Sequence, residues 1–309
     1  MIFIFCREFE SSIVKVVDWL HFYNIEYKIF TNNSKINIHI EFIENKEKIF
    51  INNMDVDEVK TIFYRNGEIL SGIKINVNNS NLNQGLNKFI EQEWLILRDY
   101  LFSYLKEKKH VGNYELRVLN KLTQLSLAVQ SGLKIPNTVI GGCKKSFTKL
   151  KKNNKITKPV SEIFHFSDGE YNYSSYVKRL DDRKIENKAE EFFPSLVQEE
   201  VDKKYELRIF FLNNLIYPMA IFSSDDKVDV READVDKQKR FVPYKLDKEI
   251  EKKVKRLIQL TELQTGSIDM IVTHKKEYYF LEVNPSGQYE YLSYYCNYNL
   301  SKKIAEELL

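Results

Sequence analysis

The sequence contains little cysteine. Its three cysteines, Cys6, Cys143 and Cys296, are far apart, odd in number and without the close spacing of metal ligands. This pattern is typical of a protein that works in a reducing compartment. The sequence also lacks a long apolar run, and no basic segment precedes the apolar N-terminus, so we expect neither a transmembrane span nor a signal peptide. A cytoplasmic location follows from these expectations.

An excess of charge of one sign is missing too. The chain carries 47 Lys and Arg against 44 Asp and Glu, a net charge of +3. That balance is too even to favour a nucleic-acid or membrane partner. Hydrophobic residues make up 43% and charged residues 29%, as in ordinary globular proteins. The 309 residues suffice for two or three packed units.

A glycine-rich phosphate loop is absent from the place where a nucleotide fold often carries one. The spacing of apolar residues predicts a strand at Met1–Phe5, a helix at Ile13–Tyr23 and a strand at Glu26–Phe30. No glycine motif joins this first strand to its helix, so the dinucleotide fingerprint is excluded. The five histidines are scattered and Cys296 lies among tyrosines, which argues against Ser/His/Asp or Cys/His catalysis.

The remaining pattern predicts an α/β protein with three parts, 1–109, 110–195 and 196–309. A long helix at Leu82–Lys108 ends the first part. In the second, Asn120 is the expected N-cap of a helix that ends at Gly132. We expect that helix to bury one stripe, made of Leu122, Leu125 and Val129. A polar, aromatic loop is expected at Phe164–Tyr176.

The third part alternates strands with helices. The expected strands are Glu206–Leu212, Ser267–Thr273 and Tyr278–Val283, and the expected helices are Lys248–Leu263 and Ser301–Leu309.

The last two of these strands, Ser267–Thr273 and Tyr278–Val283, flank the polar loop His274–Glu277, and we predict that they form a hairpin. We expect Thr273 to pair with Tyr278, and counting outward then places Asp269 opposite Glu282. Strand alternation predicts one apolar, core-facing side, made of Ile268, Met270, Val272, Tyr279, Leu281 and Val283. The other side carries Asp269, Glu282 and Asn284, beside Ile271 and Phe280.

That second side is a candidate metal site. Like charges directly opposite one another destabilise a sheet, so Asp269 and Glu282 call for a cation. Two carboxylates and the Asn284 carboxamide form an all-oxygen ligand set, which suits Mg²⁺ or Mn²⁺ completed by substrate phosphates. The alternative is an exposed hairpin with incidental acids, but the strand exit at Asn284-Pro285 fixes the asparagine in place.

A second strand has a similar design. Glu206 and Arg208 share one side of Glu206–Leu212, while Leu207, Ile209 and Phe211 share the other. A carboxylate can accept ribose hydroxyls, and a guanidinium can bind a phosphate or carboxylate in a bidentate manner. An ordinary ion pair within the strand is the alternative.

Together these features resemble the ATP-grasp superfamily, over nearly the whole chain. The matching elements are Lys121 at the start of a helix, Lys158 on a strand, the hinge Gln198–Val201, and Asp269, Glu282 and Asn284. The resemblance implies an ATP-grasp fold with an N-terminal β-α-β domain, a central domain and a C-terminal domain built on an antiparallel sheet.

Further motifs are similar to those of the graspetide synthetases, in particular the grasp-with-spasm peptide maturases. They are Leu281–Gln288, Ser293–Asn297, Lys303–Ala305, Val17–Leu20, Tyr64–Gly67 and Gly132–Pro136. Val228–Arg231 looks like the Asp-x-Arg element of that family, although tryptophan is more usual where Val230 stands.

This resemblance implies a function and a role for each residue. ATP would phosphorylate a Glu or Asp side chain of a ribosomal precursor peptide, and a Ser, Thr or Lys side chain of the same peptide would then form an ω-ester or ω-amide. Lys121 and Lys158 would bind phosphates, and Glu206 would bind the ribose. Adenine would lie against Gln198, Glu199 and Val201. Asp269, Glu282 and Asn284 would hold one or two Mg²⁺, and Arg208 and Arg231 would receive the acyl phosphate or the substrate carboxylate. A homodimer is implied as well.

Two other functions stay open. An ATP-grasp ligase that joins an amino acid to a peptide or protein would share the metal site, so that site does not separate it from a macrocyclase. The motifs after the last strand favour the macrocyclase. A non-catalytic ATP-binding module is the other alternative, and the complete set of lysines, carboxylates and asparagine argues against it.

Overall fold

The computed structural model describes residues 1–150, 155–161, 165–180, 185–186, 189–223 and 239–309. It divides into two compact units. The first comprises Met1–Val118, Leu263–Gly266 and Pro285–Leu309, and the second comprises Leu119–Glu262 and Ser267–Asn284. No helix in the described part of the chain is long and apolar enough to span a membrane.

The first unit is built on a four-stranded parallel sheet with the order β2-β1-β6-β7. Its strands are β1 (Ile2–Cys6), β2 (Tyr27–Thr31), β6 (Thr61–Arg65) and β7 (Lys109–Val111). Every residue of β1 and β6 is buried, as expected for strands covered on both faces. Helix α1 (Val14–Phe22) connects β1 to β2, so the predicted β-α-β opening is confirmed to within two residues.

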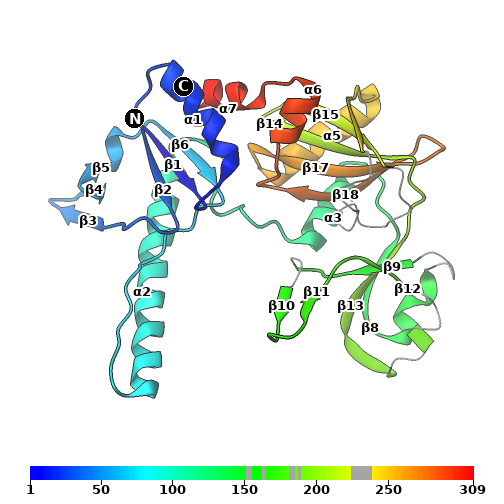
Figure 1. Ribbon diagram of the computed structural model, residues 1–309, viewed down its shortest axis with the longest axis horizontal. Helices are drawn as coiled ribbons and strands as arrows, with labels where there is room; N and C mark the ends of the chain where they lie inside the picture. Colours follow the sequence, from blue (N-terminus) through cyan, green and yellow to red (C-terminus); the bar gives the residue numbers. More distant parts are fainter. Residues whose placement is uncertain (151–154, 162–164, 181–184, 187–188, 224–238) are drawn as a thin grey trace. The chain divides into compact units, whose positions relative to one another are not determined.

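Three further helices belong to this unit: α2 (Ser80–Leu105), α6 (Glu290–Cys296) and α7 (Leu300–Leu308). A small antiparallel sheet joins β3 (Ile38–Ile43), β4 (Lys46–Ile51) and β5 (Met54–Asp55). In α2 the fully buried residues lie in the last two turns, at Leu101, Phe102 and Leu105. The earlier turns of this long helix, drawn in cyan in Figure 1, carry exposed side chains instead.

The motif Tyr64–Gly67 has a structural role in this unit. Arg65 is buried, and its guanidinium donates to the Ser12 Oγ and to the Gly287 carbonyl, each at 3.0 Å. It thereby joins β6 to the segment that follows the last strand of the chain. A Cβ at position 67 would lie 2.5 Å from the Cys6 nitrogen. Only glycine allows this close approach of two backbones.

The second unit contains two separate larger sheets. One has the order β12-β9-β13-β8 and joins β8 (Thr138–Cys143), β9 (Lys155–Lys158), β12 (Lys178–Leu180) and β13 (Glu191–Glu199). Its small core lies on one side, where Val197 packs with Phe147 and Leu150. Within 164–176, the described residues include a two-stranded hairpin of β10 (His165–Ser167) and β11 (Asn172–Ser174). The expectation of a loop without strands there was therefore wrong.

The other sheet has five strands in the order β16-β15-β14-β17-β18. They are β14 (Tyr205–Leu212), β15 (Leu215–Phe222), β16 (Arg240–Pro243), β17 (Thr265–Val272) and β18 (Tyr278–Asn284). Its core face is almost completely buried and includes Leu207, Ile209, Phe211, Ile268, Met270 and Val272. Helix α5 (Lys248–Thr261) adds Val254, Leu257 and Ile258 to the buried residues of this unit.

Helix α3 (Lys121–Gln130) lies beside α5 and β18. Asn120 is its N-cap, as predicted, because its side chain accepts from the backbone N–H groups of Leu122 and Thr123. The predicted buried stripe was wrong. Leu122 and Val129 are exposed, and the residues that α3 buries are Gln124 and Ala128.

The β17–β18 hairpin keeps the predicted pairing of Asp269 with Glu282, but its turn differs from the prediction. The Thr273 N–H donates to the Glu277 carbonyl, and Lys276 adopts a left-handed conformation at φ 60°. This closes a shorter loop than expected, so Tyr278 pairs with Val272 instead of Thr273. A β-bulge opposite Asp269 then restores the predicted register.

The predicted core face of β18 was wrong between the turn and the bulge. Tyr278 and Phe280 are buried in the core, whereas Tyr279 and Leu281, which we had placed there, are only partly buried. A one-residue shift in register moves each side chain to the other face. The shift at the turn therefore reversed the expected faces up to the bulge, and the residues after it lie as predicted.

Candidate nucleotide and metal site

The open face of the five-stranded sheet carries a cluster of charged side chains. Asp269 and Glu282 face each other across β17 and β18, and Arg208 lies on the adjacent strand β14. The Arg208 Nη1 donates to both carboxylate oxygens of Asp269, at 3.1 and 2.9 Å. Only 15% of the Arg208 side chain and 23% of the Asp269 side chain are exposed to solvent, so this ion pair is partly desolvated.

The carboxylates of this cluster oppose one another. The pKa of Asp269 is raised to about 6, mainly by burial. The positive charge of Arg208 opposes this increase, and the negative charges of Glu282 and Glu206 contribute to it. A buried carboxylate with two like-charged neighbours is electrostatically unfavourable until a cation joins it. Among the described residues, the three carboxylates Asp269, Glu282 and Glu206 thus lie close together, with Arg208 paired to Asp269.

Two further oxygen atoms lie on this side of the hairpin. Ser267 pairs with Asn284, and alternation places both side chains on the same face as Asp269 and Glu282. The Ser267 hydroxyl is buried and has no hydrogen-bond partner among the described residues. A buried polar group without a partner is rare in folded proteins. The acids, the carboxamide and the orphaned hydroxyl form a set of hard oxygen donors that fits Mg²⁺.

No group of three or more His, Cys, Asp or Glu side chains in the described ranges is arranged to hold a metal. The candidate set therefore depends on its carboxamide as the third protein ligand. Magnesium commonly uses only one or two carboxylates and completes its shell with water and substrate phosphates.

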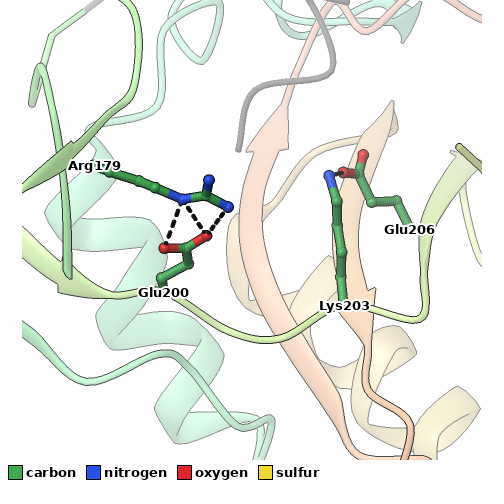
Figure 2. Close-up of polar contacts among 4 residues, drawn as sticks. All are labelled: Arg179, Glu200, Lys203 and Glu206. Atoms are coloured by element: carbon green, nitrogen blue, oxygen red, sulfur yellow. Dashed lines mark hydrogen bonds and ion pairs between the residues drawn. The ribbon is translucent and has the colours of Figure 1, made fainter. Parts of the chain in front are cut away.

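Glu206 lies on the same side but is occupied by a neighbour. The Lys203 Nζ donates to the Glu206 Oε1 at 2.7 Å (Figure 2). Both side chains are about four-fifths buried, with 20% and 22% exposed. The alternative considered for this strand was an ion pair between Glu206 and Arg208. In the described residues each of them instead forms an ion pair with another partner, Glu206 with Lys203 and Arg208 with Asp269. Glu206 and Arg208 both lie on β14, whereas the residues that pair with them, Lys203 and Asp269, lie outside this strand.

The predicted hinge begins in the last two residues of β13, Gln198 and Glu199, and continues past the strand end. Three of its residues are each held by a separate partner. The buried Gln198 donates from Nε2 to the Thr138 Oγ1 at 2.7 Å. Glu199 is tied to Asn137 twice, by its backbone N–H at 2.8 Å and by its carboxylate at 2.6 Å. Glu200 forms a bidentate pair with Arg179 of β12, with contacts of 2.7 to 3.1 Å (Figure 2).

Val201 differs from these three residues. Within the described part of the chain, its backbone groups take part in no hydrogen bond. An adenine base needs one donor and one acceptor along a stretch of backbone. Val201 offers both, and the side-chain contacts of the preceding residues hold the strand exit in place.

The two predicted phosphate lysines come from different elements that meet near the end of β9. The Lys121 Nζ donates to the carbonyl oxygens of Pro159 at 3.4 Å and Ser161 at 2.6 Å, directly after Lys158. Lys158 pairs with Leu196, on the side of the sheet that also carries Gln198. Both lysines are partly buried, and both lie at the C-terminal end of β9.

Arg231 and the Asp-x-Arg element lie outside the described residues. Four other residues of this region escaped the sequence-based prediction: Arg179, Lys203, Ser267 and Gln124. Lys203 lies three residues before Glu206, a spacing too common to indicate a pair. Ser267 could have been found, because the predicted register of the hairpin already places it opposite Asn284. The contacts of Arg179 and Gln124 join separate segments of the chain, and no local pattern indicates them.

A parallel β-α-β unit followed by two antiparallel sheets, one that leads into the predicted hinge and one that carries an acidic hairpin, is the architecture of an ATP-grasp protein. Residues 118–308 match the RimK-like ATP-grasp domain. The chain therefore belongs to the RimK-like ATP-grasp family.

Solved structures with the same fold cover nearly the full length of both chains. Macrocyclase MdnC of Microcystis aeruginosa MRC, bound with its precursor peptide MdnA, is 24% identical with a TM-score of 0.80, and 100% of this chain and 99% of that one are covered. A ligase of Chryseobacterium gregarium associated with ribosomally made, modified peptides was solved with ADP, a leader and a core peptide. It is 22% identical with a TM-score of 0.79, and coverage is 99% and 96%.

PsnB, an ATP-grasp ligase complexed with a minimal precursor, is 15% identical with a TM-score of 0.74, and coverage is 99% and 98%. No curated protein sequence matches the chain. At these identities the structural likeness establishes the fold, and the predicted ATP-grasp architecture is confirmed.

Proposed function

We propose that this protein is an ATP- and Mg²⁺-dependent ligase that closes rings in a ribosomally made precursor peptide. The observation that carries the proposal is the pair of opposed, partly buried carboxylates Asp269 and Glu282 on the open face of an ATP-grasp sheet. Structures that share this fold over their whole length contain precursor peptides. These two facts support a peptide substrate together with a nucleotide and a metal.

The proposed chemistry is the one that the resemblance to peptide-modifying ATP-grasp ligases implies. A substrate carboxylate oxygen attacks the γ-phosphorus of ATP, and the bond from that phosphorus to the β–γ bridging oxygen breaks. The substrate becomes an acyl phosphate, and ADP is released. A hydroxyl or amine of the same peptide then attacks the acyl carbon, phosphate departs, and the attacking group loses its proton. Arg208 and Arg231 would bind the substrate carboxylate and stabilise the charge that develops on it. One ω-ester or ω-amide forms in each cycle.

Positioning, not covalent participation, is the part assigned to the other residues. Lys121 and Lys158 would neutralise phosphate oxygens, and Val201 would hold adenine through its backbone, between Glu199 and the ribose-binding Glu206. Asp269, Glu282 and Asn284 would hold the metal, with Mn²⁺ as a possible substitute for Mg²⁺. When bound, the metal would neutralise charge on the β- and γ-phosphates.

The partner and the setting complete the proposal. The three cysteines are free, in accord with a cytoplasmic enzyme. A homodimer is proposed as well, because Leu82, Phe89 and Ile96 form an exposed apolar stripe at seven-residue intervals along α2. An amino-acid ligase acting on a peptide or protein remains the alternative.

Mass spectrometry of a candidate precursor incubated with the protein, ATP and Mg²⁺ tests the proposal. Each ring should appear as the loss of one water, with one ADP released per ring. An amino-acid ligase would instead add the mass of an amino-acid residue, and a non-catalytic module would leave the peptide unchanged.

Two variants sharpen the same experiment. Glu282→Ala should fold but bind Mg·ATP poorly and lose the product, because Asp269 has then lost its partner ligand. Glu277→Gln removes a carboxylate from the same hairpin, where it pairs with Lys134 at 2.7 Å, and should behave like the parent. Normal turnover by Glu282→Ala at ordinary Mg²⁺ would refute the metal assignment.

A further inference from the structure

The outer edge of β18 is covered by two polar contacts from the segment around α3. The Phe280 N–H donates to the Lys134 carbonyl at 2.8 Å. The Val283 N–H donates to the Gln124 Oε1 at 2.7 Å. Since β18 is the last strand of its sheet, both N–H groups would otherwise be left without a strand partner.

The contact with Gln124 is placed at a critical point of the strand. Val283 lies between the two proposed ligands Glu282 and Asn284, directly after the bulge. Continuing the register of the hairpin past Phe280 would put Leu281 opposite Asp269, and Glu282 would then turn toward the core face. The bulge is thus what aims the Glu282 carboxylate at Asp269.

Gln124 is a buried polar side chain whose contacts are well defined. It is only 4% exposed. Its Nε2 donates to the Leu119 carbonyl at 2.8 Å, which leaves Oε1 oriented toward Val283. Leucine or methionine would fill such an inward position of α3 without the desolvation cost of an amide. Lys121, the proposed phosphate ligand, lies one turn earlier on the same helix.

We propose that Gln124 is a positioning residue, which holds the bulge of β18 in the register that directs Glu282 toward the metal and links this strand to the helix of Lys121. This role rests on the proposed nucleotide and metal site. It assigns to a residue that touches neither nucleotide nor metal a selective effect on metal affinity, comparable to that of partners that orient metal ligands in other proteins.

Three variants test this role. Gln124→Met keeps the length of the side chain and removes both hydrogen bonds. Gln124→Glu keeps an acceptor for Val283. Gln130→Met makes the same change at an exposed glutamine of α3, whose Nε2 contacts only the Ser126 Oγ at 3.2 Å.

The measurements are ADP binding across a Mg²⁺ titration and amide exchange of peptides that contain Val283. In Gln124→Met we expect faster exchange at Val283 and a Mg²⁺ requirement raised roughly tenfold or more, with unchanged ADP affinity in the absence of metal. Gln124→Glu should recover much of the protection and the Mg²⁺ response, and Gln130→Met should match the parent.

Each other outcome is decisive. A Gln124→Met variant with the parental Mg²⁺ requirement would overturn the positioning role while leaving the proposed function intact. Equal losses of ADP affinity with and without metal would show general destabilisation, and would also overturn it. A parent protein whose ADP binding does not depend on Mg²⁺ would overturn the proposed function itself.

Discussion

At the scale of single residues, the described part of the five-stranded sheet brings together three carboxylates, Asp269, Glu282 and Glu206, and two cations, Arg208 and Lys203. Arg208 pairs with Asp269 and Lys203 pairs with Glu206, while Glu282 faces Asp269 directly across the hairpin. Such an arrangement reduces the stability of the empty protein. It is retained where ligand binding repays the cost, which is the usual relation between stability and function at active sites.

The first prediction concerns Asp269→Asn in the absence of metal. Burial raises the pKa of Asp269 to about 6, above the ~3.9 of an exposed aspartate. An acid whose pKa is higher in the folded state destabilises the fold as pH rises from about 4 to about 6, and by a constant amount above that. The asparagine variant should therefore be more stable than the parent at neutral pH, by on the order of 1–3 kcal/mol.

Thermal or urea unfolding at several pH values measures this difference. Below about pH 4 it should disappear, because the parent carboxyl is then protonated in both states. Added Mg²⁺ and ADP should stabilise the parent only. An Asp269→Asn variant that is less stable than the parent at neutral pH would contradict the electrostatic argument.

A second prediction concerns the phosphate lysines. Lys158→Met keeps the apolar stem and removes the charge, so ATP affinity should fall by roughly 1–3 kcal/mol, as for a lost charge-assisted hydrogen bond. Lys178→Met is the matched control. Lys178 pairs with Thr157 on the neighbouring strand, where alternation directs its side chain away from the Lys158 side. If calorimetry shows that Lys158→Met binds ATP with the same affinity as the parent, Lys158 does not belong to the site.

At the scale of elements, the sequence predicts a helix, strand or pairing well where neighbouring residues specify it, and poorly where distant contacts do. The β1-α1-β2 opening, the Asn120 cap and the pairing of Asp269 with Glu282 follow from patterns within a few residues, and each was predicted. The turn at Lys276 and the bulge after Phe280 were not, because no local signal distinguishes a three-residue loop with a bulge from a four-residue loop without one. The errors cancelled at the acids, since each shifts the register by one residue.

The stripe of α3 failed for a different reason. Leucine and valine positions suggested the buried side, yet the helix buries Gln124, whose partner Val283 lies 159 residues further along the chain. A polar side chain in the interior is determined by contacts distant in sequence, which no periodicity reveals. The same holds for the Arg179–Glu200 pair, which joins β12 to the hinge.

That pair supports a third prediction. The Arg179 side chain is 58% exposed, so its ion pair should contribute less than about 1 kcal/mol to global stability. Arg179→Met should therefore unfold like the parent. The variant should still bind ADP roughly twofold to fivefold more weakly, because Glu200 anchors the backbone that leads into Val201.

A double-mutant cycle with Glu200→Gln separates this effect from others. If the two residues act through their mutual contact, the double variant should bind ADP about as well as either single variant, since contacting residues are not additive. Additive losses in ADP affinity would mean that each residue acts on its own.

At the scale of the whole molecule, the last prediction concerns self-association. Leu82, Phe89 and Ile96 are 53%, 57% and 71% exposed, and their seven-residue spacing places them along one side of α2. Exposed apolar stripes of this kind mark contact surfaces, and a second copy of α2 would offer a matching stripe.

We expect a dimer in sedimentation equilibrium at micromolar concentration and a monomer for Phe89→Glu. Gln84→Glu adds the same charge to the helix away from the stripe and should stay dimeric. Both variants should bind ADP normally, since α2 carries none of the proposed nucleotide residues. A monomeric parent, or a dimeric Phe89→Glu variant, would show that α2 is not the contact surface.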